Sequence, residues 1–292
     1  MSEYLQTPVE IKKVEIDWLN RIALKDVKIS DKDSLTILEA NNLTVGFKLL
    51  PALKNKWVIT TVRLFGFGLH LTKETPESKT NLEKLIEPLL KKQNNHPTID
   101  LQVYSILLRR GNFTCNVLNK PLVKNVFNPN HIDVNDISGK LSLWHLSEDS
   151  IHAEISKLSF VESAGFTVKK LTADFSSNKD STFVKNVMLV LPHSAIIIPE
   201  VSIGAGLLKN DSVTVKLNEA SFALEIDSSN ILPSDFRSFY PELQNLTNKI
   251  EIGANLSGSI NSLNINKIIM NYGNCLSFAG DVNLKGLGDK NE

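Results

Sequence analysis

Alternating apolar residues run almost from one end of the chain to the other, but the alternation repeatedly slips by one position. A period of two is typical of strands with one buried face. Because a slip would turn every later side chain to the other face, each slip predicts a bulge, a kink or a tight reversal. The slips fall between Val103 and Ile106, Val134 and Ile137, Ile155 and Leu158, Val168 and Leu171, Leu217 and Phe222, and Ile260 and Leu263. This series of bulged strands predicts a strongly curved sheet.

We therefore predict a mainly β fold, an elongated antiparallel sheet that forms an open hydrophobic groove. Residues 1–292 are expected to be one continuous segment of a longer protein. Asn41 and Asn42 are expected to separate two strands, and Arg110–Asn112 to form a turn. Gly66 and Gly68 predict a bulge or sharp bend inside the strand that starts at Trp57.

Two stretches break the strand pattern and predict short helical insertions, at about residues 80–92 and 233–246. In the first, Leu82, Leu85, Ile86, Leu89 and Leu90 recur at the spacing of an amphipathic helix. We expect this apolar stripe to pack against the sheet rather than on a partner. The second stretch contains Pro241, which should keep its helix short.

Composition excludes several classes of protein. The 32 basic and 32 acidic residues give a formal net charge of zero, which argues against nucleic-acid binding. Cys115 and Cys275 lie in phase with apolar neighbours, which predicts two buried thiols and no disulfide. The sequence contains neither a signal peptide nor a run of about 20 apolar residues. The chain is then either cytosolic or a piece of an anchored or exported protein.

No sequence motif indicates catalysis. A nucleophile elbow, a phosphate-binding loop and a dinucleotide fingerprint are all missing, and Gly204–Gly206 is best interpreted as a turn. His145 and His152 flank a predicted turn and could meet across a hairpin, but a polar pair at strand ends is the simpler interpretation. We predict that the chain is not an enzyme and binds no metal or cofactor.

One family resemblance rests on longer stretches. The first reads SDKDSLTILEANNLTVGFKLLPALKNKWVITTVRLFGFGLHL (30–71), and it is supported by ILLRRGNF (106–113), FNPNHIDVNDISGKLSL (127–143), the helical segments and residues 256–287. These stretches resemble the TamB/AsmA-like family of bacterial envelope proteins, especially the N-terminal region of its Bacteroidetes-type members. The resemblance covers most of the chain.

The resemblance implies a periplasmic segment of a protein anchored in the inner membrane. Family members form a long curled sheet with an apolar interior, and they are linked to phospholipid movement toward the outer membrane. They are also linked to assembly of outer-membrane barrels with an Omp85-type partner. The chain departs from the family because it lacks the membrane helix and the C-terminal domain. Contacts with that partner are expected in parts of the full protein that this chain lacks.

Lipid shielding agrees with elementary energetics. Each methylene removed from water is worth about 0.8 kcal/mol, so a bare sixteen-carbon chain in water costs on the order of 10 kcal/mol. We expect phospholipid acyl chains to contact in-phase residues of the clearest strands. If Leu189 lines the groove, Leu189→Asp should impair transport and leave the fold largely intact. The candidate groove residues are Leu64, Leu69, Leu71, Leu101, Leu141, Leu143, Phe160, Leu189 and Leu191.

Two other interpretations stay open. An open sheet has edges that recruit strands, so the chain could serve as a scaffold for nascent barrel strands. A β-sandwich module of the carbohydrate-binding or adhesin type is the other alternative. In that case Trp18, Trp57, Tyr104 and Trp144 would stack on sugar rings, although packing in the core is favoured for these residues.

Overall fold

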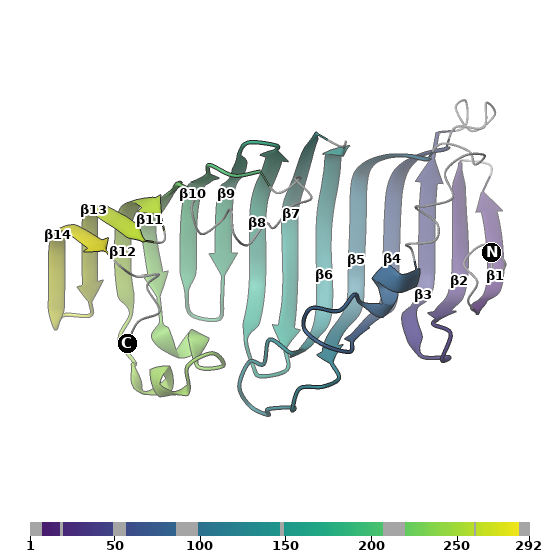
Figure 1. Cartoon of the computed structure of the whole chain (residues 1–292), viewed down its shortest axis with the longest axis horizontal. Coiled ribbons are helices and arrows are strands. Elements are labelled where there is room, and N and C mark those ends of the chain that lie inside the picture. Colours follow the sequence, from purple (N-terminus) through teal and green to yellow (C-terminus); the bar gives the residue numbers. More distant parts are fainter. Residues whose placement is uncertain are drawn as a thin grey trace. The chain divides into compact units, whose positions relative to one another are not determined.

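The computed structural model describes residues 8–17, 20–48, 57–85, 99–146, 149–206, 220–259 and 261–285. The described strands form a single fourteen-stranded sheet that is not closed into a barrel, and its strands lie in chain order (Figure 1). The strands are β1 (Val9–Asp17), β2 (Arg21–Ser30), β3 (Thr36–Phe47), β4 (Trp57–Lys73), β5 (Ile99–Val117), β6 (His131–Leu146), β7 (Ser150–Glu162), β8 (Thr167–Asn178), β9 (Thr182–Val190), β10 (Ala195–Ile203), β11 (Phe222–Ile231), β12 (Ile250–Ser259), β13 (Ser262–Tyr272) and β14 (Leu276–Lys285). The predicted β class is confirmed.

The chain divides into two compact units, which we describe separately. The first unit comprises Met1–Ser142 and Ser159–Phe166, and the second comprises Leu143–Leu158 and Thr167–Glu292. Strands β6 and β7 therefore contribute residues to both units. The expectation of one continuous segment stays a prediction.

The prediction of an entirely antiparallel sheet is wrong at one place, because β4 and β5 run parallel. Parallel neighbours need a long crossover connection, whereas antiparallel neighbours can be joined by a tight turn. The chain between Lys73 and Ile99 supplies that crossover and includes the first predicted helical insertion. The amphipathic stripe predicted a helix in this connection, but it did not predict that the flanking strands run parallel.

A line of bent residues crosses the strands of the first unit, and we call it the crease. The register places Asp26 of β2, Asn41 of β3, Gly66 of β4 and Arg110 of β5 side by side. Three of them have left-handed backbone conformations, with φ of 48° at Asp26, 57° at Gly66 and 52° at Arg110. Each strand continues through the crease. The separation expected at Asn41 and the turn expected at Arg110–Asn112 are therefore wrong, and both positions mark a bend within one long strand.

Several of the predicted slips coincide with irregular pairing. Asp136 of β6 has a φ of 55° and lies where the β5–β6 register shifts between Ile137 and Val134, which confirms that slip. The slip after Val103 is confirmed by a register shift between β4 and β5. Between β8 and β9 the register shifts at Thr172 and Asp174, but the extra residue lies in β9, so the slip expected between Val168 and Leu171 stays a prediction. The slips that include Leu217 and Ile260 fall on residues outside the described ranges.

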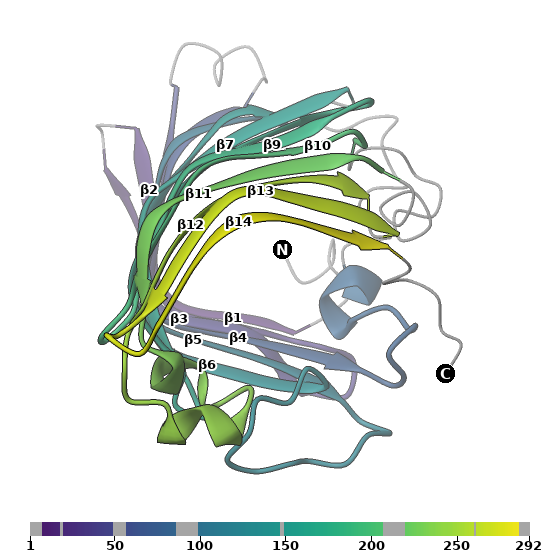
Figure 2. The same ribbon diagram turned by 90° about the vertical axis from the view of Figure 1, so that its left-hand side faces the viewer.

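The second unit also has bulges near the middle of its strands. An extra residue interrupts β9 at Asn186 (φ 54°) and β13 at Lys267 (φ 52°), and the β10–β11 and β11–β12 registers shift as well. Bulges increase local twist and bend the strand that carries them. Figure 2 shows β11 to β14 bending strongly along their length.

Within the described residues, helical structure is limited to short segments. Residues 81–85 form a helical turn, and the rest of the stretch to residue 92 lies outside the described residues. Thr80 and Glu83 form a capping box, because Thr80 N–H donates to the Glu83 carboxylate and Glu83 N–H donates to Thr80 Oγ1 (3.1 Å). Leu85 is buried, as expected for the apolar stripe. The second insertion is not an α-helix but two 3₁₀ turns, η1 (Pro233–Phe236) and η2 (Pro241–Asn245), since each proline begins a new turn.

Candidate functional site

The first unit carries an apolar face on one side of its sheet. Cross-strand pairs place apolar residues opposite one another on β1 to β6, and opposed residues share a face. On β2 to β5 these residues are two positions apart, except at the crease, where they are three apart. The crease therefore keeps the apolar side chains on one face along each strand. The rows are Val9–Ile29–Leu38–Leu69–Phe113–Val134, Ile11–Val27–Ala40–Phe67–Gly111–Ile137, Val14–Leu24–Leu43–Leu64–Leu108–Gly139 and Ile16–Ile22–Val45–Val62–Ile106–Leu141.

The opposite face of the first unit is polar. Glu15 accepts from both Lys13 and Lys25 at 2.8 Å, and together these two cations lower the pKa of Glu15 to about 2. His70 Nδ1 lies 3.0 Å from Thr114 Oγ1 on the neighbouring strand. Such a sheet exposes one face that water solvates well and one that it solvates poorly.

The second unit repeats this division. Its longest apolar row crosses seven strands, and every member is half-buried: Phe175, Val184, Val201, Leu224, Leu256, Ile265 and Val282. Along each strand, the residues directly before and after the row member lie on the other face, and these neighbours are mainly polar. One cross-strand series of them is Glu225, Asn255 and Asn266. We call these rows of the two units the apolar faces.

Few side chains of the described residues cover the apolar faces. Most of their members are half-buried rather than buried, and Val14 and Ile16 are 54 % and 76 % exposed. The described chain contains no second sheet, and its helical segments are the turn at 81–85, η1 and η2. A sheet with one apolar face normally buries that face against another layer. Here the described residues supply no such layer for most of it.

The structure places the predicted groove residues as follows. Leu64, Leu69 and Leu141 are half-buried members of the apolar rows in the first unit. Leu71 extends the same face, because it pairs with Cys115, and Cys115 pairs with Ile132. Leu101 pairs with Ile59, but its side chain is outside the described part.

The other four candidates lie on β6, β7 and β9 and just after β9. Leu143, Phe160 and Leu189 are half-buried. Leu189 is paired with Leu171 on one side and Ile196 on the other. Leu191 is only 2 % exposed and belongs to the core of the second unit. The sequence analysis did not identify the seven-strand row around Leu256, although the alternation of apolar and polar residues in these strands is visible in the sequence.

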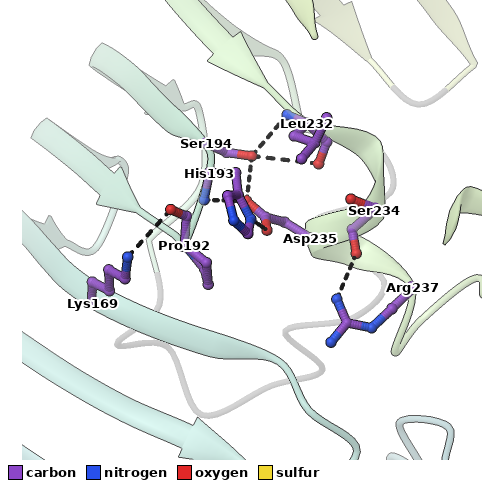
Figure 3. A network of polar contacts seen from close by, with 8 residues as sticks. All are labelled: Lys169, Pro192, His193, Ser194, Leu232, Ser234, Asp235 and Arg237. Carbon is purple, nitrogen blue, oxygen red and sulfur yellow. Dashed lines mark hydrogen bonds and ion pairs between the residues drawn. The ribbon is translucent and has the colours of Figure 1, made fainter. Parts of the chain in front are cut away.

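A buried carboxylate joins the turn after β9 to η1 in the second unit (Figure 3). The Asp235 side chain is 2 % exposed and accepts from Ser194 Oγ (2.7 Å) and from the backbone N–H of His193 (2.9 Å). His193 Nδ1 lies 3.0 Å from the other carboxylate oxygen. Burial by itself raises the pKa of Asp235, but the hydrogen bonds from Ser194 and His193 outweigh it, so the pKa lies below its ordinary value. No sequence motif signalled this cluster.

This Ser–His–Asp cluster is not arranged for nucleophilic catalysis. In a triad the histidine lies between serine and aspartate and takes the proton of the hydroxyl. Here Ser194 Oγ donates directly to Asp235, and Leu232 N–H donates to Ser194 Oγ at 2.8 Å. The cluster therefore fastens the η1 segment to the β9–β10 turn. A cavity of about 690 Å³ next to it is lined in part by Leu191, His193 and Lys249.

The histidines and cysteines singled out in the sequence lie at separate places in the structure. His145 and His152 line one cavity of about 320 Å³, but the described residues contain no group of three side chains that could hold a metal ion. Cys115 is half-buried, whereas Cys275 is exposed in the turn before β14, so the expectation of a buried thiol is wrong there. Cys275 is exposed because it lies in the turn between β13 and β14, beyond the last paired residues of the two strands.

Of the four aromatic residues considered for sugar stacking, the structure describes the side chains of two. The side chains of Tyr104 and Trp144 are 42 % and 45 % exposed. The prediction that these two rings pack in the core is therefore wrong. Both lie on long strands whose faces are not fully covered. Trp18 lies outside the described residues, and so does the side chain of Trp57.

Comparison with known proteins adds no assignment. No protein-family model matches the chain, and no curated protein matches it. None of the helices within the described ranges is both long and apolar enough to cross a membrane. The two apolar faces are therefore the features of the described chain that bear most on its function.

Proposed function

We propose that the chain shields lipid acyl chains on its apolar faces, as the periplasmic segment of a TamB-like envelope protein that moves phospholipid between the inner and outer membranes. The observation that carries this proposal is the row of seven half-buried apolar residues across β8 to β14, opposed by a polar face. No covalent step is needed, because the work consists of keeping hydrocarbon out of water. Support of outer-membrane barrel assembly with an Omp85-type partner belongs to the same proposal.

The dimensions of the row suit a hydrocarbon chain. Neighbouring strands lie about 4.8 Å apart, so a row that crosses seven strands is roughly 29 Å long. A sixteen-carbon chain has an extended length of about 20 Å, because each tetrahedral carbon–carbon bond of about 1.5 Å advances the chain by about 1.3 Å. Each apolar contact contributes little, but the sum over a chain is large because the effect follows buried area.

The matched variants are Leu256→Ser and Ser257→Asp, at adjacent positions of β12. Leu256 lies in the apolar row between Leu224 and Ile265, and Ser257 lies on the polar face between Ala223 and Asn264. Native mass spectrometry of chain incubated with phosphatidylethanolamine vesicles measures bound phospholipid. We expect Leu256→Ser to reduce bound lipid several-fold and Ser257→Asp to leave it unchanged. Circular dichroism checks that both variants are folded. Unmodified protein that retains no phospholipid would refute the proposal.

A second candidate function is carbohydrate binding at Trp144. This ring is exposed on β6, and its Nε1–H donates to Glu154 Oε2 at 3.3 Å. An exposed ring beside a carboxylate can stack on a sugar and accept from its hydroxyls. Glycan-array binding that Trp144→Ala abolishes, without phospholipid in the mass spectrum, would favour this function over lipid shielding.

A further inference from the structure

The connection between β5 and β6, residues 118–130, carries exposed apolar side chains, and we call it the β5–β6 loop. Figure 1 shows it projecting beyond the ends of these two strands. Leu118, Leu122 and Val123 are 65 %, 62 % and 54 % exposed, and they lie within six residues of chain. Isolated exposed apolar residues are common on protein surfaces, but a group of them marks a site of interaction.

The charge of the β5–β6 loop is positive. The stretch VLNKPLVKNVFNPNHI (117–132) contains Lys120 and Lys124 but no aspartate or glutamate, and both lysines are exposed. Glu74 lies beside the start of the loop, because its carbonyl accepts from the Asn119 N–H at 3.3 Å. Its carboxylate is already paired with Lys84 at 2.7 Å. The loop therefore interleaves apolar side chains with cations that no carboxylate of the loop itself neutralises.

Hydrogen bonds hold the base of the β5–β6 loop in place. His131 Nε2 lies 2.8 Å from the carbonyl oxygen of Lys120, and Asn128 Nδ2 donates to the carbonyl of Pro121 at 3.2 Å. Asn128 itself is buried, whereas residues 118–125 are all exposed. The apolar side chains are thus presented on a backbone that is fixed at both ends. Such preorganisation lowers the entropic cost of binding.

We propose that the β5–β6 loop docks on the surface of a phospholipid bilayer that contains anionic lipid. Leu122 and Val123 enter the boundary between head groups and acyl chains, and Lys120 and Lys124 contact the anionic head groups. Apolar side chains gain from leaving water there, and an anionic surface attracts each nearby lysine. The charge complementarity favours this surface over a purely apolar protein groove, which would leave both lysines without a partner. The proposal concerns the loop and does not depend on acyl-chain shielding by the sheet.

Vesicle co-sedimentation of the full chain tests the docking. We expect binding to vesicles of phosphatidylcholine with phosphatidylglycerol, little binding to phosphatidylcholine alone, and a decrease as salt is added. The double variant Lys120→Gln/Lys124→Gln should weaken binding about tenfold. Leu122→Ser/Val123→Ser should weaken it by a similar factor. Tyr240→Ser is the matched control, because Tyr240 is 66 % exposed in the second unit, and it should leave binding unchanged.

A probe placed in the loop reports insertion directly. The experiment uses the full chain with Cys115 and Cys275 replaced by serine, and Val123→Cys labelled with an environment-sensitive fluorophore. We expect the emission to shift to the blue on vesicles with phosphatidylglycerol and to be quenched by nitroxides on the acyl chains. The same label on Tyr240→Cys should not respond. Bound vesicles with no response at position 123, or equal responses at both positions, would overturn the proposal.

A third measurement separates loop docking from lipid shielding. Native mass spectrometry compares phospholipid retained by the unmodified chain and by Leu122→Ser/Val123→Ser, after both are loaded from detergent-dissolved phosphatidylethanolamine. We expect the variant to retain as much phospholipid as the unmodified chain while its vesicle binding falls. An unmodified chain that binds no vesicles, or loop variants that bind them undiminished, would overturn the docking proposal whether or not phospholipid is retained. A chain that binds vesicles through the loop but retains no phospholipid would instead refute lipid shielding alone.

Discussion

The crease makes a quantitative prediction about Gly66. Its φ is 57°, and a Cβ at this position would overlap the Asn41 side chain. An L-residue in the left-handed region costs about 1–2 kcal/mol. Replacing glycine also lowers the entropy of the unfolded chain, which is worth about 0.4–1 kcal/mol in favour of the variant. Since Asn41 can rotate away, we expect Gly66→Ala to lower the free energy of unfolding by about 1 kcal/mol.

Two further variants isolate the backbone effect. Asp136→Gly removes a side chain from a left-handed position (φ 55°) and should raise the free energy of unfolding by up to about 1 kcal/mol. Gly253→Ala is the matched control, because an added Cβ would have no heavy atom nearer than the Ile226 carbonyl at 3.6 Å and the backbone is not left-handed. It should be neutral or slightly stabilising.

The assay is urea unfolding followed by far-ultraviolet circular dichroism, with the m-value checked for each variant. Equal effects of Gly66→Ala and Gly253→Ala would refute the reasoning. A loss of stability in Asp136→Gly comparable to that in Gly66→Ala would refute it too. Either result would show that left-handed conformations do not hold the bends of these strands.

Three more predictions concern single groups. Because the folded-state pKa of Asp235 is lowered, its contribution to stability is present above its ordinary pKa and is lost as the pH falls through the folded value. Asp235→Asn should therefore cost about 2 kcal/mol at neutral pH and flatten the acid limb of a stability–pH curve; an unchanged acid limb would contradict this. Thr80→Ala should cost about 1 kcal/mol in urea unfolding, and Glu83→Gln less, since an amide oxygen still accepts; the reverse order would contradict the capping box. In the native protein a thiol reagent should label Cys275 faster than Cys115, with equal rates after denaturation, and equal native rates would contradict the exposure of the β13–β14 turn.

The sequence predicted bends, but it could not tell a bend from a chain reversal. Asn41 and Arg110 both carry local signals that are shared by turns and by left-handed bulges. The distinction depends on whether the strand continues to pair with its neighbours beyond that point. Pairing is a property of distant segments, so only the register of β3, β4 and β5 showed that both residues lie within long strands.

The buried cluster around Asp235 illustrates a second limit. His193 and Ser194 are separated from Asp235 by more than forty residues, and no motif links them. A short polar segment has the same local appearance whether its carboxylate is exposed or enclosed. The enclosure exists because η1 folds back onto the β9–β10 turn, where two N–H groups and a hydroxyl replace water.

The alternation of side chains by itself determined that this protein is a β protein with one apolar and one polar face, because the period of two is a local property of extended backbone. The same pattern placed Leu64, Leu69 and Leu141 on the apolar side of their strands. The tertiary structure alone decided that β4 and β5 run parallel and that the bulges of the first unit align into a crease. These features follow from which strands meet and in what register, and that is fixed by long-range packing rather than by local conformational preference.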